Sequence, residues 1–241
     1  MDIQILDNFD ELSLATAKRV ADYVNANPGA LLCIAAGRTT LAMLGELVAM
    51  QRRREVDLAS VRYAGLDEWV GLAPDDERSC YSRMTKVFYG PAGIPDENIR
   101  LFNGVDADME RQCAMMDDWI SSYGGVGLVL LGIGMNGHVG FNEPGTPAYE
   151  GCLVTVLDRA TVEAGAIRFG AMEPPLTKGI TIGWRTLLDA RNVILMAGGQ
   201  EKAGIMKTIL KGPATIGVPA SMFQNHANAV ALLDAAAASL L

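Results

Sequence analysis

Short apolar runs alternate with segments of helical periodicity along almost the whole chain. The apolar runs are bounded by turn-forming residues, which predicts buried strands. The segments between them place apolar residues at helical spacing, which predicts amphipathic helices. The expected strands are Met1–Ile5, Ala30–Ala36, Val61–Leu66, Val126–Gly132, Asn192–Ala197 and Ala229–Leu233. The expected helices are Glu11–Ala26, Leu41–Gln51, Ser79–Tyr89, Asp106–Tyr123, Gly179–Leu187 and Gln200–Leu210.

Strands that are apolar on both faces and separated by helices are typical of a parallel sheet covered on both sides. We therefore predict an α/β fold with a doubly wound, mostly parallel sheet and helices on both faces, a Rossmann-like three-layer arrangement. Neither a repeat nor a linker divides the sequence, so residues 1–241 are expected to form one domain.

Polar clusters follow four of the expected strands. They lie at Gly37–Thr40, Asp67-Glu68, Asn136–Glu143 and Gly198–Lys202. Ligands of open α/β sheets bind beyond the carboxyl ends of the strands, and these clusters share that edge. We therefore expect them to converge on one site.

The net charge of the chain bears on which molecules it could bind. With 20 basic and 28 acidic residues the net charge is −8, which disfavours nucleic acid as a partner. A small anionic substrate remains possible, because a few local cations and backbone N–H groups suffice to bind it. The N-terminal residues lack the basic and apolar regions of a signal peptide, and no apolar run approaches the ~20 residues of a membrane span. We expect a cytoplasmic protein without a membrane partner.

The four cysteines are widely scattered, and no Cys-x-x-Cys pair or Cys/His cluster is present. Neither a zinc site nor a disulfide framework is predicted, so free thiols are expected. No metal and no cofactor are expected. The sequence is compatible with both a monomer and a homo-oligomer.

The densest chemical signal is the glycine-rich segment from Gly132 to Gly145. Its Gly132-x-Gly134-x-x-Gly137 pattern is that of a dinucleotide-binding turn, but such a turn needs a helix to begin at the third glycine. The residues that follow are typical of a loop. We favour the interpretation that the glycines let the backbone approach a ligand closely.

Within this loop His138 and Glu143 present an imidazole and a carboxylate together. Histidine is the side chain whose ordinary pKa suits proton transfer near neutral pH, and a nearby carboxylate can orient it and stabilise its cation. The other histidine, His226, has no nearby acids in the sequence and is predicted to be structural.

Two further clusters are ambiguous from the residues alone. Asp67 could face the site as a carboxylate base, with Glu68 in a structural role, or the two acids could cap a following helix. Gly37, Arg38, Thr39 and Thr40 could form an anion site at a helix start or a plain helix cap. Lys202 could reach the same anion or remain solvated.

Together these segments resemble the glucosamine-6-phosphate deaminase/isomerase family, whose superfamily includes 6-phosphogluconolactonases. The resemblance rests on Leu66–Leu72, Gly132–Gly145, Gly183–Val193 and Gly199–Ala203. It implies an aldose–ketose isomerase and deaminase, a hydrolase that acts on a hexosamine 6-phosphate.

The resemblance also implies roles for individual residues. Asp67 matches the base that moves a proton between C2 and C1 of the sugar, and His138 and Glu143 match the residues that open the ring. The phosphate pocket maps to Gly37–Thr40, Arg168 and Lys202. The mixed composition of residues 149–172, which include Arg168, would allow a mobile lid.

One position departs from the glucosamine enzymes, which usually carry Asp where this chain has Asn136. An amide can still orient His138 but adds no negative charge, so we expect a weaker base. Asn at this position resembles the galactosamine-6-phosphate subgroup. The main hypothesis is therefore conversion of galactosamine 6-phosphate to tagatose 6-phosphate and ammonia. The alternatives are a glucosamine-6-phosphate deaminase, a 6-phosphogluconolactonase, a non-catalytic sugar-phosphate sensor and a dinucleotide-dependent oxidoreductase.

Overall fold

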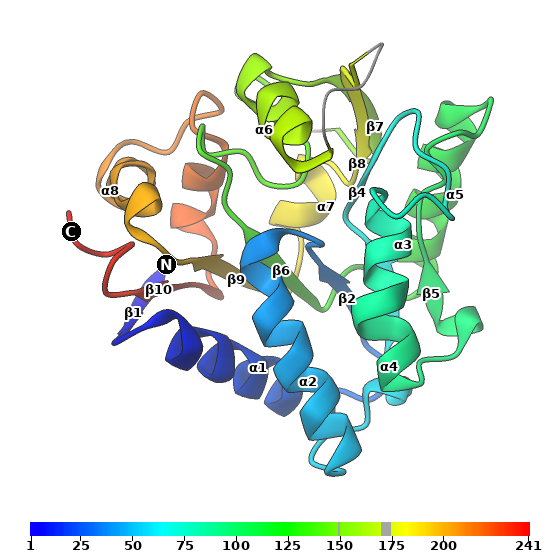
Figure 1. Ribbon diagram of the computed structural model, residues 1–241, viewed down its shortest axis with the longest axis horizontal. Coiled ribbons are helices and arrows are strands. Elements are labelled where there is room, and N and C mark those ends of the chain that lie inside the picture. Colours follow the sequence, from blue (N-terminus) through cyan, green and yellow to red (C-terminus); the bar gives the residue numbers. More distant parts are fainter. Residues whose placement is uncertain (149, 170–174) are drawn as a thin grey trace.

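Seven parallel strands form the central sheet of the computed structural model, which describes residues 1–148, 150–169 and 175–241, with only the backbone at 168 and 169 (Figure 1). In order across the sheet the strands are β1 (Asp2–Leu6), β10 (Ala229–Asp234), β9 (Asn192–Ala197), β6 (Leu128–Gly132), β2 (Leu31–Ile34), β3 (Arg62–Gly65) and β5 (Ile99–Arg100). Every neighbouring pair is parallel. The predicted doubly wound α/β fold is confirmed.

Helices cover both faces of this sheet and close two hydrophobic cores. One core packs against α1 (Phe9–Ala26), α2 (Leu41–Arg52), α3 (Cys80–Met84) and α4 (Gly90–Ala92). The other packs against α5 (Met109–Ser122), α7 (Trp184–Leu188) and α8 (Ala203–Lys211). In β6, Leu128 and Leu130 face the first core while Val129 and Leu131 face the second, as the period of two in a strand requires. None of the helices in the described part of the chain is both long and apolar enough to cross a bilayer.

The direction of winding reverses between β2 and β6. From β2 the chain moves through β3 to β5 at one edge, whereas from β6 it moves through β9 to β10 toward the other edge. The loops that leave these two neighbouring strands therefore diverge, and this opens a crevice beyond their carboxyl ends. Two of the polar clusters, Gly37–Thr40 and Asn136–Glu143, follow these strands.

A second, antiparallel sheet lies at the same end of the molecule and was not predicted. It consists of β4 (Asp67–Trp69), β8 (Lys178–Thr181) and β7 (Leu153–Val156), in that order. Figure 1 shows it at the top with α6 (Arg159–Phe169), so part of the segment in which a lid was considered forms β7 and α6. The remaining residues of that segment, 149 and 170–172, lie outside the described residues.

Two helix predictions were wrong in extent. The expected helix at 179–187 begins as strand β8, because the β-branched residues Ile180 and Thr181 pair with β4, and only Trp184–Leu188 is helical. The expected helix at 79–89 does not end at Gly90-Pro91. It widens into a π-helical turn directly before Pro91, whose ring would clash with a preceding carbonyl in a regular helix, and ends at Gly93 with a φ of 69°.

A pair of glycine substitutions tests the packing of the second sheet. A Cβ at Gly183, between β8 and α7, would overlap the carbonyl oxygens of Glu150 and Gly151, so we expect Gly183→Ala to lower the free energy of unfolding by about 3 kcal/mol. Gly45 lies exposed inside α2 with open space around it, so Gly45→Ala is expected to raise that free energy by about 1 kcal/mol. Urea unfolding followed by circular dichroism measures both changes. Equal effects of the two substitutions would contradict this account.

Candidate functional site

The loop after β6 brings an imidazole, a carboxylate and an amide into contact. Nδ1 of His138 lies 3.4 Å from Oε2 of Glu143, and Nδ2 of Asn136 donates to the same oxygen at 2.9 Å. Oδ1 of Asn136 accepts from the backbone N–H of His138 at 3.1 Å. Asn136 therefore acts on the carboxylate and the main chain, and orients the imidazole only through Glu143.

Glu143 is a buried carboxylate held in its charged form. Burial by itself raises the pKa of Glu143, but hydrogen bonds from His138, Thr161 and Asn136 and the charge of His138 together outweigh it. The net pKa therefore lies below its ordinary value. Its side chain is 6% exposed and that of His138 is 22% exposed, so the imidazole is the member of the pair that reaches the surface.

The glycines of this loop determine its shape, whereas we expected them to let the backbone approach a ligand. A Cβ at Gly134 would overlap the ring of His138, so this glycine makes room for the imidazole itself. Gly137 and Gly140 have φ values of 85° and 57°, in the left-handed region that glycine adopts without strain. The backbone then turns back on itself, and Gly134 N–H donates to the carbonyl of His138.

Asp67 is tied to the His138 loop through Thr181. Asp67 opens β4 and pairs with Thr181 of β8. The hydroxyl of Thr181 accepts from the backbone N–H of Phe141 at 3.2 Å and donates to the carbonyl of Leu66 at 3.3 Å. One hydroxyl therefore joins the residue before Asp67 to the loop that carries His138. Asp67 also lines a pocket between β2, β3 and α3.

The neighbouring Glu68 has the structural role that one interpretation gave it. Its carboxylate accepts backbone hydrogen bonds from Trp69, Cys80 and Tyr81, which fastens β4 to the start of α3. The side chain is buried, and burial, with a smaller contribution from Asp67, raises the pKa of Glu68 to about 7 although the three N–H donors lower it. The carboxylate of Glu68 is therefore occupied by the backbone N–H groups of these three residues.

Arg38, Thr39 and Lys202 converge beside the end of β6. The Cβ of Thr39 approaches the position that a Cβ would take on Gly132. The ammonium of Lys202 donates to the carbonyl of Ile133 at 2.7 Å. Burial, followed by the repulsion of Arg38, lowers the pKa of Lys202, against an opposing effect of Glu201. Two cations close together on a glycine-rich edge are well suited to an anion.

Of two further predicted anion contacts, Thr40 is placed differently and the side chain of Arg168 is not described. The hydroxyl of Thr40 is buried and hydrogen-bonded to the carbonyls of Ala35 and Gly37, so it braces the turn after β2 instead of facing the site. Arg168 lies in the last turn of α6, but its side chain lies outside the described residues. Gly37 contributes the backbone that precedes the helical turn Arg38–Thr40.

His226 has the contacts of a structural histidine. Its Nε2 lies 2.8 Å from the carbonyl of Ala190, and its Nδ1 accepts from the N–H of Asn228. Within the described part of the chain, no group of three or more metal-ligating side chains is assembled, and all four cysteines are free.

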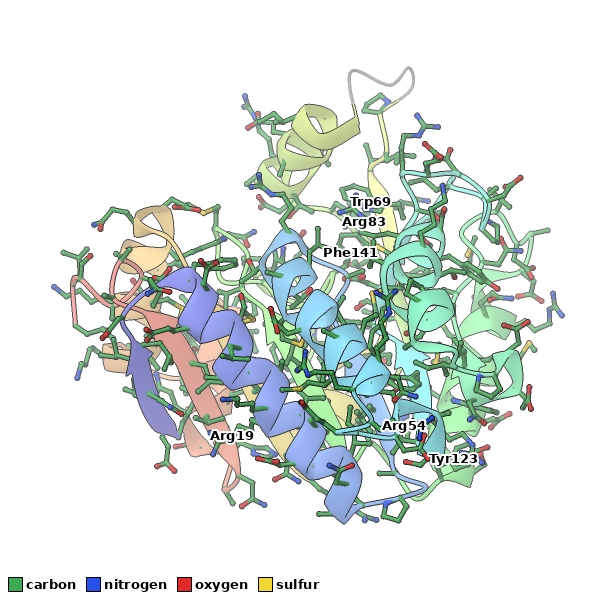
Figure 2. All side chains as sticks on the ribbon, turned by 60° about the horizontal axis from the view of Figure 1, so that its bottom comes forward. Arg19, Arg54, Trp69, Arg83, Tyr123 and Phe141 are labelled. Carbon is green, nitrogen blue, oxygen red and sulfur yellow. The ribbon has the colours of Figure 1, made fainter. Side chains whose placement is uncertain are left out.

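Two contributions from α6 and from the aromatic residue that ends β4 were not predicted. Thr161, in the first turn of α6, places its hydroxyl 3.2 Å from Nδ1 of His138. The rings of Trp69 and Phe141 meet edge to face at 4.9 Å, and Figure 2 shows them together below α6. The only local signal was Asp158, whose side chain caps the start of α6 at the N–H of Ala160.

This arrangement can move protons on a small anionic molecule. The imidazole of His138 is a proton carrier near neutral pH, the carboxylate of Asp67 is a base on the adjoining strand, and Lys202 with Arg38 supplies positive charge. The segments that carry them follow β6, β3, β9 and β2 along the chain, at the carboxyl-end edge of the parallel sheet.

The chain is similar to known proteins over almost its whole length. A family model described as glucosamine-6-phosphate isomerases/6-phosphogluconolactonase matches residues 7–232. Two curated relatives, the glucosamine-6-phosphate deaminases of Clostridium perfringens and Thermoanaerobacter pseudethanolicus, are each 34% identical to the chain over 241 residues. The alignments cover all of this chain and 100% and 95% of the two relatives.

Solved structures show the same similarity. A monomeric glucosamine-6-phosphate deaminase has a TM-score of 0.96 at 30% identity, with 100% of both chains covered. A 6-phosphogluconolactonase from Leishmania guyanensis has a TM-score of 0.74 at 19% identity, with 98% of this chain and 97% of that one covered, which shows a shared fold.

The buried Glu68 predicts a pH-dependent stability. Its folded-state pKa of about 7 lies above the ordinary value of 4.5, so its contribution to stability is complete below about pH 4.5 and is lost as the pH rises through 7. We expect this group to lower the free energy of unfolding by about 3 kcal/mol between pH 4.5 and pH 8. Urea unfolding at a series of pH values measures it.

Glu68→Gln should abolish that decline, whatever its effect on absolute stability, because a glutamine does not titrate. Glu77→Gln is the matched control, since Glu77 is exposed and paired only with Lys86 in the described contacts, and should leave the decline intact. A decline of equal size in all three proteins would show that other groups cause it.

Proposed function

Because the chain belongs to the glucosamine-6-phosphate isomerase/6-phosphogluconolactonase family, we propose that it is an amino-sugar-phosphate deaminase that converts glucosamine 6-phosphate to fructose 6-phosphate and ammonia. The observation that carries the proposal is the contact of His138 with Glu143 on the loop after β6, a loop that Thr181 joins to the start of the Asp67 strand and whose Ile133 carbonyl accepts from the Lys202 ammonium. The relatives are named as deaminases, so the description as an isomerase and deaminase replaces that of a hydrolase.

The anion site holds the phosphate in this proposal. Lys202 has three N–H donors and uses one on Ile133, which leaves others for phosphate oxygens. Arg38 and the backbone N–H groups at the turn of Gly37–Thr40 add further donors, and Thr39 adds its hydroxyl. Arg168 joins this set as a prediction from the family resemblance.

Ring opening falls to His138 and Glu143. The imidazole takes the proton of the hydroxyl at C1 and delivers a proton to the ring oxygen, so the C1–O bond to the ring breaks and an aldehyde forms. The negative charge of Glu143 stabilises the imidazolium that exists between these two transfers. Asn136 keeps that charge in place through its hydrogen bond to Oε2.

Asp67 then isomerises the open chain. Its carboxylate removes the proton from C2, and the enediol-type intermediate takes a proton back at C1. The amine-bearing C2 becomes an imine carbon, water adds to it, and ammonia leaves to give the ketose. The proton therefore returns to the carbon skeleton, and the nitrogen departs as the only leaving group.

The choice of glucosamine reverses our preference from the sequence. Asn136 favoured galactosamine 6-phosphate by family resemblance, whereas the curated relatives at 34% identity are named glucosamine-6-phosphate deaminases. Since Asn136 contacts Glu143 and the backbone of His138, it lies in the ring-opening pair and has no described contact that would read the C4 hydroxyl.

The substrate is tested by ammonia release from glucosamine 6-phosphate and galactosamine 6-phosphate side by side, without added metal or nicotinamide. We expect the higher kcat/KM with glucosamine 6-phosphate. Asp67→Asn should lower kcat by about 100- to 10,000-fold, because it removes the base for the C2 proton. His226→Gln, at the structural histidine, is the control and should stay within about twofold of the wild type.

Other outcomes would reject parts of the proposal. Faster release of ammonia from galactosamine 6-phosphate would identify that sugar as the preferred substrate. Acid production from a 6-phosphogluconolactone without ammonia from either sugar would identify a lactonase, and tight binding without turnover would identify a sensor.

Lys202 predicts a separate effect on substrate binding. Lys202→Met should raise KM by about 10- to 100-fold with a smaller change in kcat, because a charge-assisted contact to the phosphate is lost. Since the pKa of Lys202 is lowered, the wild-type KM should begin to rise at a lower pH than an ordinary lysine would give, and Lys202→Met should lose this alkaline rise. Lys207→Met, at an exposed lysine of α8, is the control. An unchanged KM in Lys202→Met would remove Lys202 from the phosphate site.

A further inference from the structure

The hydroxyl of Thr161 reaches out of its own helix to the ring-opening pair. Thr161 is 5% exposed and lies in the first turn of α6. Its Oγ1 is 3.2 Å from Nδ1 of His138, and a hydrogen bond from Thr161 also lowers the pKa of Glu143. This single hydroxyl therefore lies against both members of the pair.

Other hydroxyls in the helices behave differently. Ser13, Thr16 and Thr208 each donate to the carbonyl four residues earlier in their own helix. A residue in the first turn has no helical carbonyl at that position, so its hydroxyl is available for another partner. In Thr161 that partner is 23 residues away in the sequence, on the loop after β6.

The surroundings of Nδ1 decide which ring nitrogen of His138 carries the hydrogen. Oε2 of Glu143 lies 3.4 Å from Nδ1, and an ionised carboxylate only accepts hydrogen bonds. An Nδ1 without a hydrogen would turn its lone pair toward that negative charge and would draw the Thr161 hydrogen away from Glu143. An Nδ1–H instead donates toward both oxygens and leaves the Thr161 hydrogen for the carboxylate.

We propose that Thr161 is a positioning residue that, together with Glu143, holds neutral His138 in the Nδ1–H tautomer, so that Nε2 keeps the lone pair that receives the substrate proton. The kinetic part of this inference rests on the proposed function, whereas the tautomer does not. Thr161 accepts from Nδ1–H and donates to Glu143, and it thereby keeps both groups in one geometry. Gly165 of the same helix lies against the ring of Trp69, and that ring packs on Phe141 of the loop, so α6 is held over the loop by this contact.

The tautomer can be read directly, because the chain has only two histidines. His226 is an internal reference of the opposite kind, since its Nε2 donates to the carbonyl of Ala190 and its Nδ1 accepts from Asn228. In protein labelled with 15N-histidine, at a pH where both rings are neutral, two-bond 1H–15N correlation spectra distinguish protonated from unprotonated ring nitrogens. We expect Nδ1–H in His138 and Nε2–H in His226.

Substitutions separate the role of Thr161 from that of packing. Thr161→Val keeps the branched shape and removes the hydroxyl, so the His138 signals should move toward a mixture of tautomers while those of His226 remain unchanged. In the ammonia assay kcat should fall by about tenfold, which is the effect of one lost hydrogen bond. KM should change by no more than about twofold. Thr161→Ser should restore both readouts.

Thr155→Val is the matched control, because Thr155 lies on β7 beside α6 and its hydroxyl bonds to the carbonyl of Val156. It should match the wild type in the spectra and in kcat. Unfolding curves of all the variants show whether the fold is retained.

Three results would overturn the inference: Nε2–H in wild-type His138, an unchanged tautomer and kcat in Thr161→Val, or a Thr161→Ser variant as impaired as Thr161→Val. If the wild type releases no ammonia from either sugar, the proposed function fails, but the spectra of wild type and Thr161→Val still decide the role of Thr161.

Discussion

The hydroxyl of Thr181 is the contact on which the candidate site depends. It accepts from the N–H of Phe141 and donates to the carbonyl of Leu66, while its backbone pairs with Asp67. The loop of His138 leaves the main parallel sheet and Asp67 begins the small antiparallel sheet, so neither sheet alone brings them together. A buried hydroxyl with several backbone partners is costly to separate, because each partner would be left unsatisfied. The two sheets therefore act as one scaffold at this point.

Two buried glutamates, Glu68 and Glu143, have pKa values shifted in opposite directions because their surroundings differ. Glu68 is surrounded by backbone N–H donors, yet its burial dominates and its pKa rises to about 7. Glu143 is also buried, but the imidazole of His138, Thr161 and Asn136 hold its pKa below the ordinary value. The first carboxyl joins β4 to α3, and the second supplies a negative charge beside an imidazole. Both roles serve the same end, because β4 positions Asp67 and Glu143 positions His138.

The amide of Asn136 suits a charged Glu143. An aspartate at this position would place a second carboxylate about where Nδ2 now donates to Oε2 of Glu143, and two such charges at hydrogen-bonding distance oppose each other's ionisation. The amide instead supports the charge on Glu143. Asn136 therefore acts on the imidazole of His138 through the carboxylate that both side chains contact, and it holds the backbone N–H of His138 directly.

The sequence by itself determined the parallel sheet, its two helical layers and the positions of the polar clusters. These follow from local periodicity and from the rule that parallel strands end at one edge, and neither depends on knowing distant neighbours. It also identified the loop of His138 and Glu143, because glycines with unusual backbone angles lie close together in the chain. Only the tertiary structure decided the second sheet, since its short strands are stabilised by pairing with segments elsewhere in the chain, such as Asp67 with Thr181. For the same reason the sequence could not show that Thr40 turns inward or that Thr161 reaches His138. A hydroxyl takes whichever partner the packed helices and loops bring to it, and that choice is made only when the chain has folded.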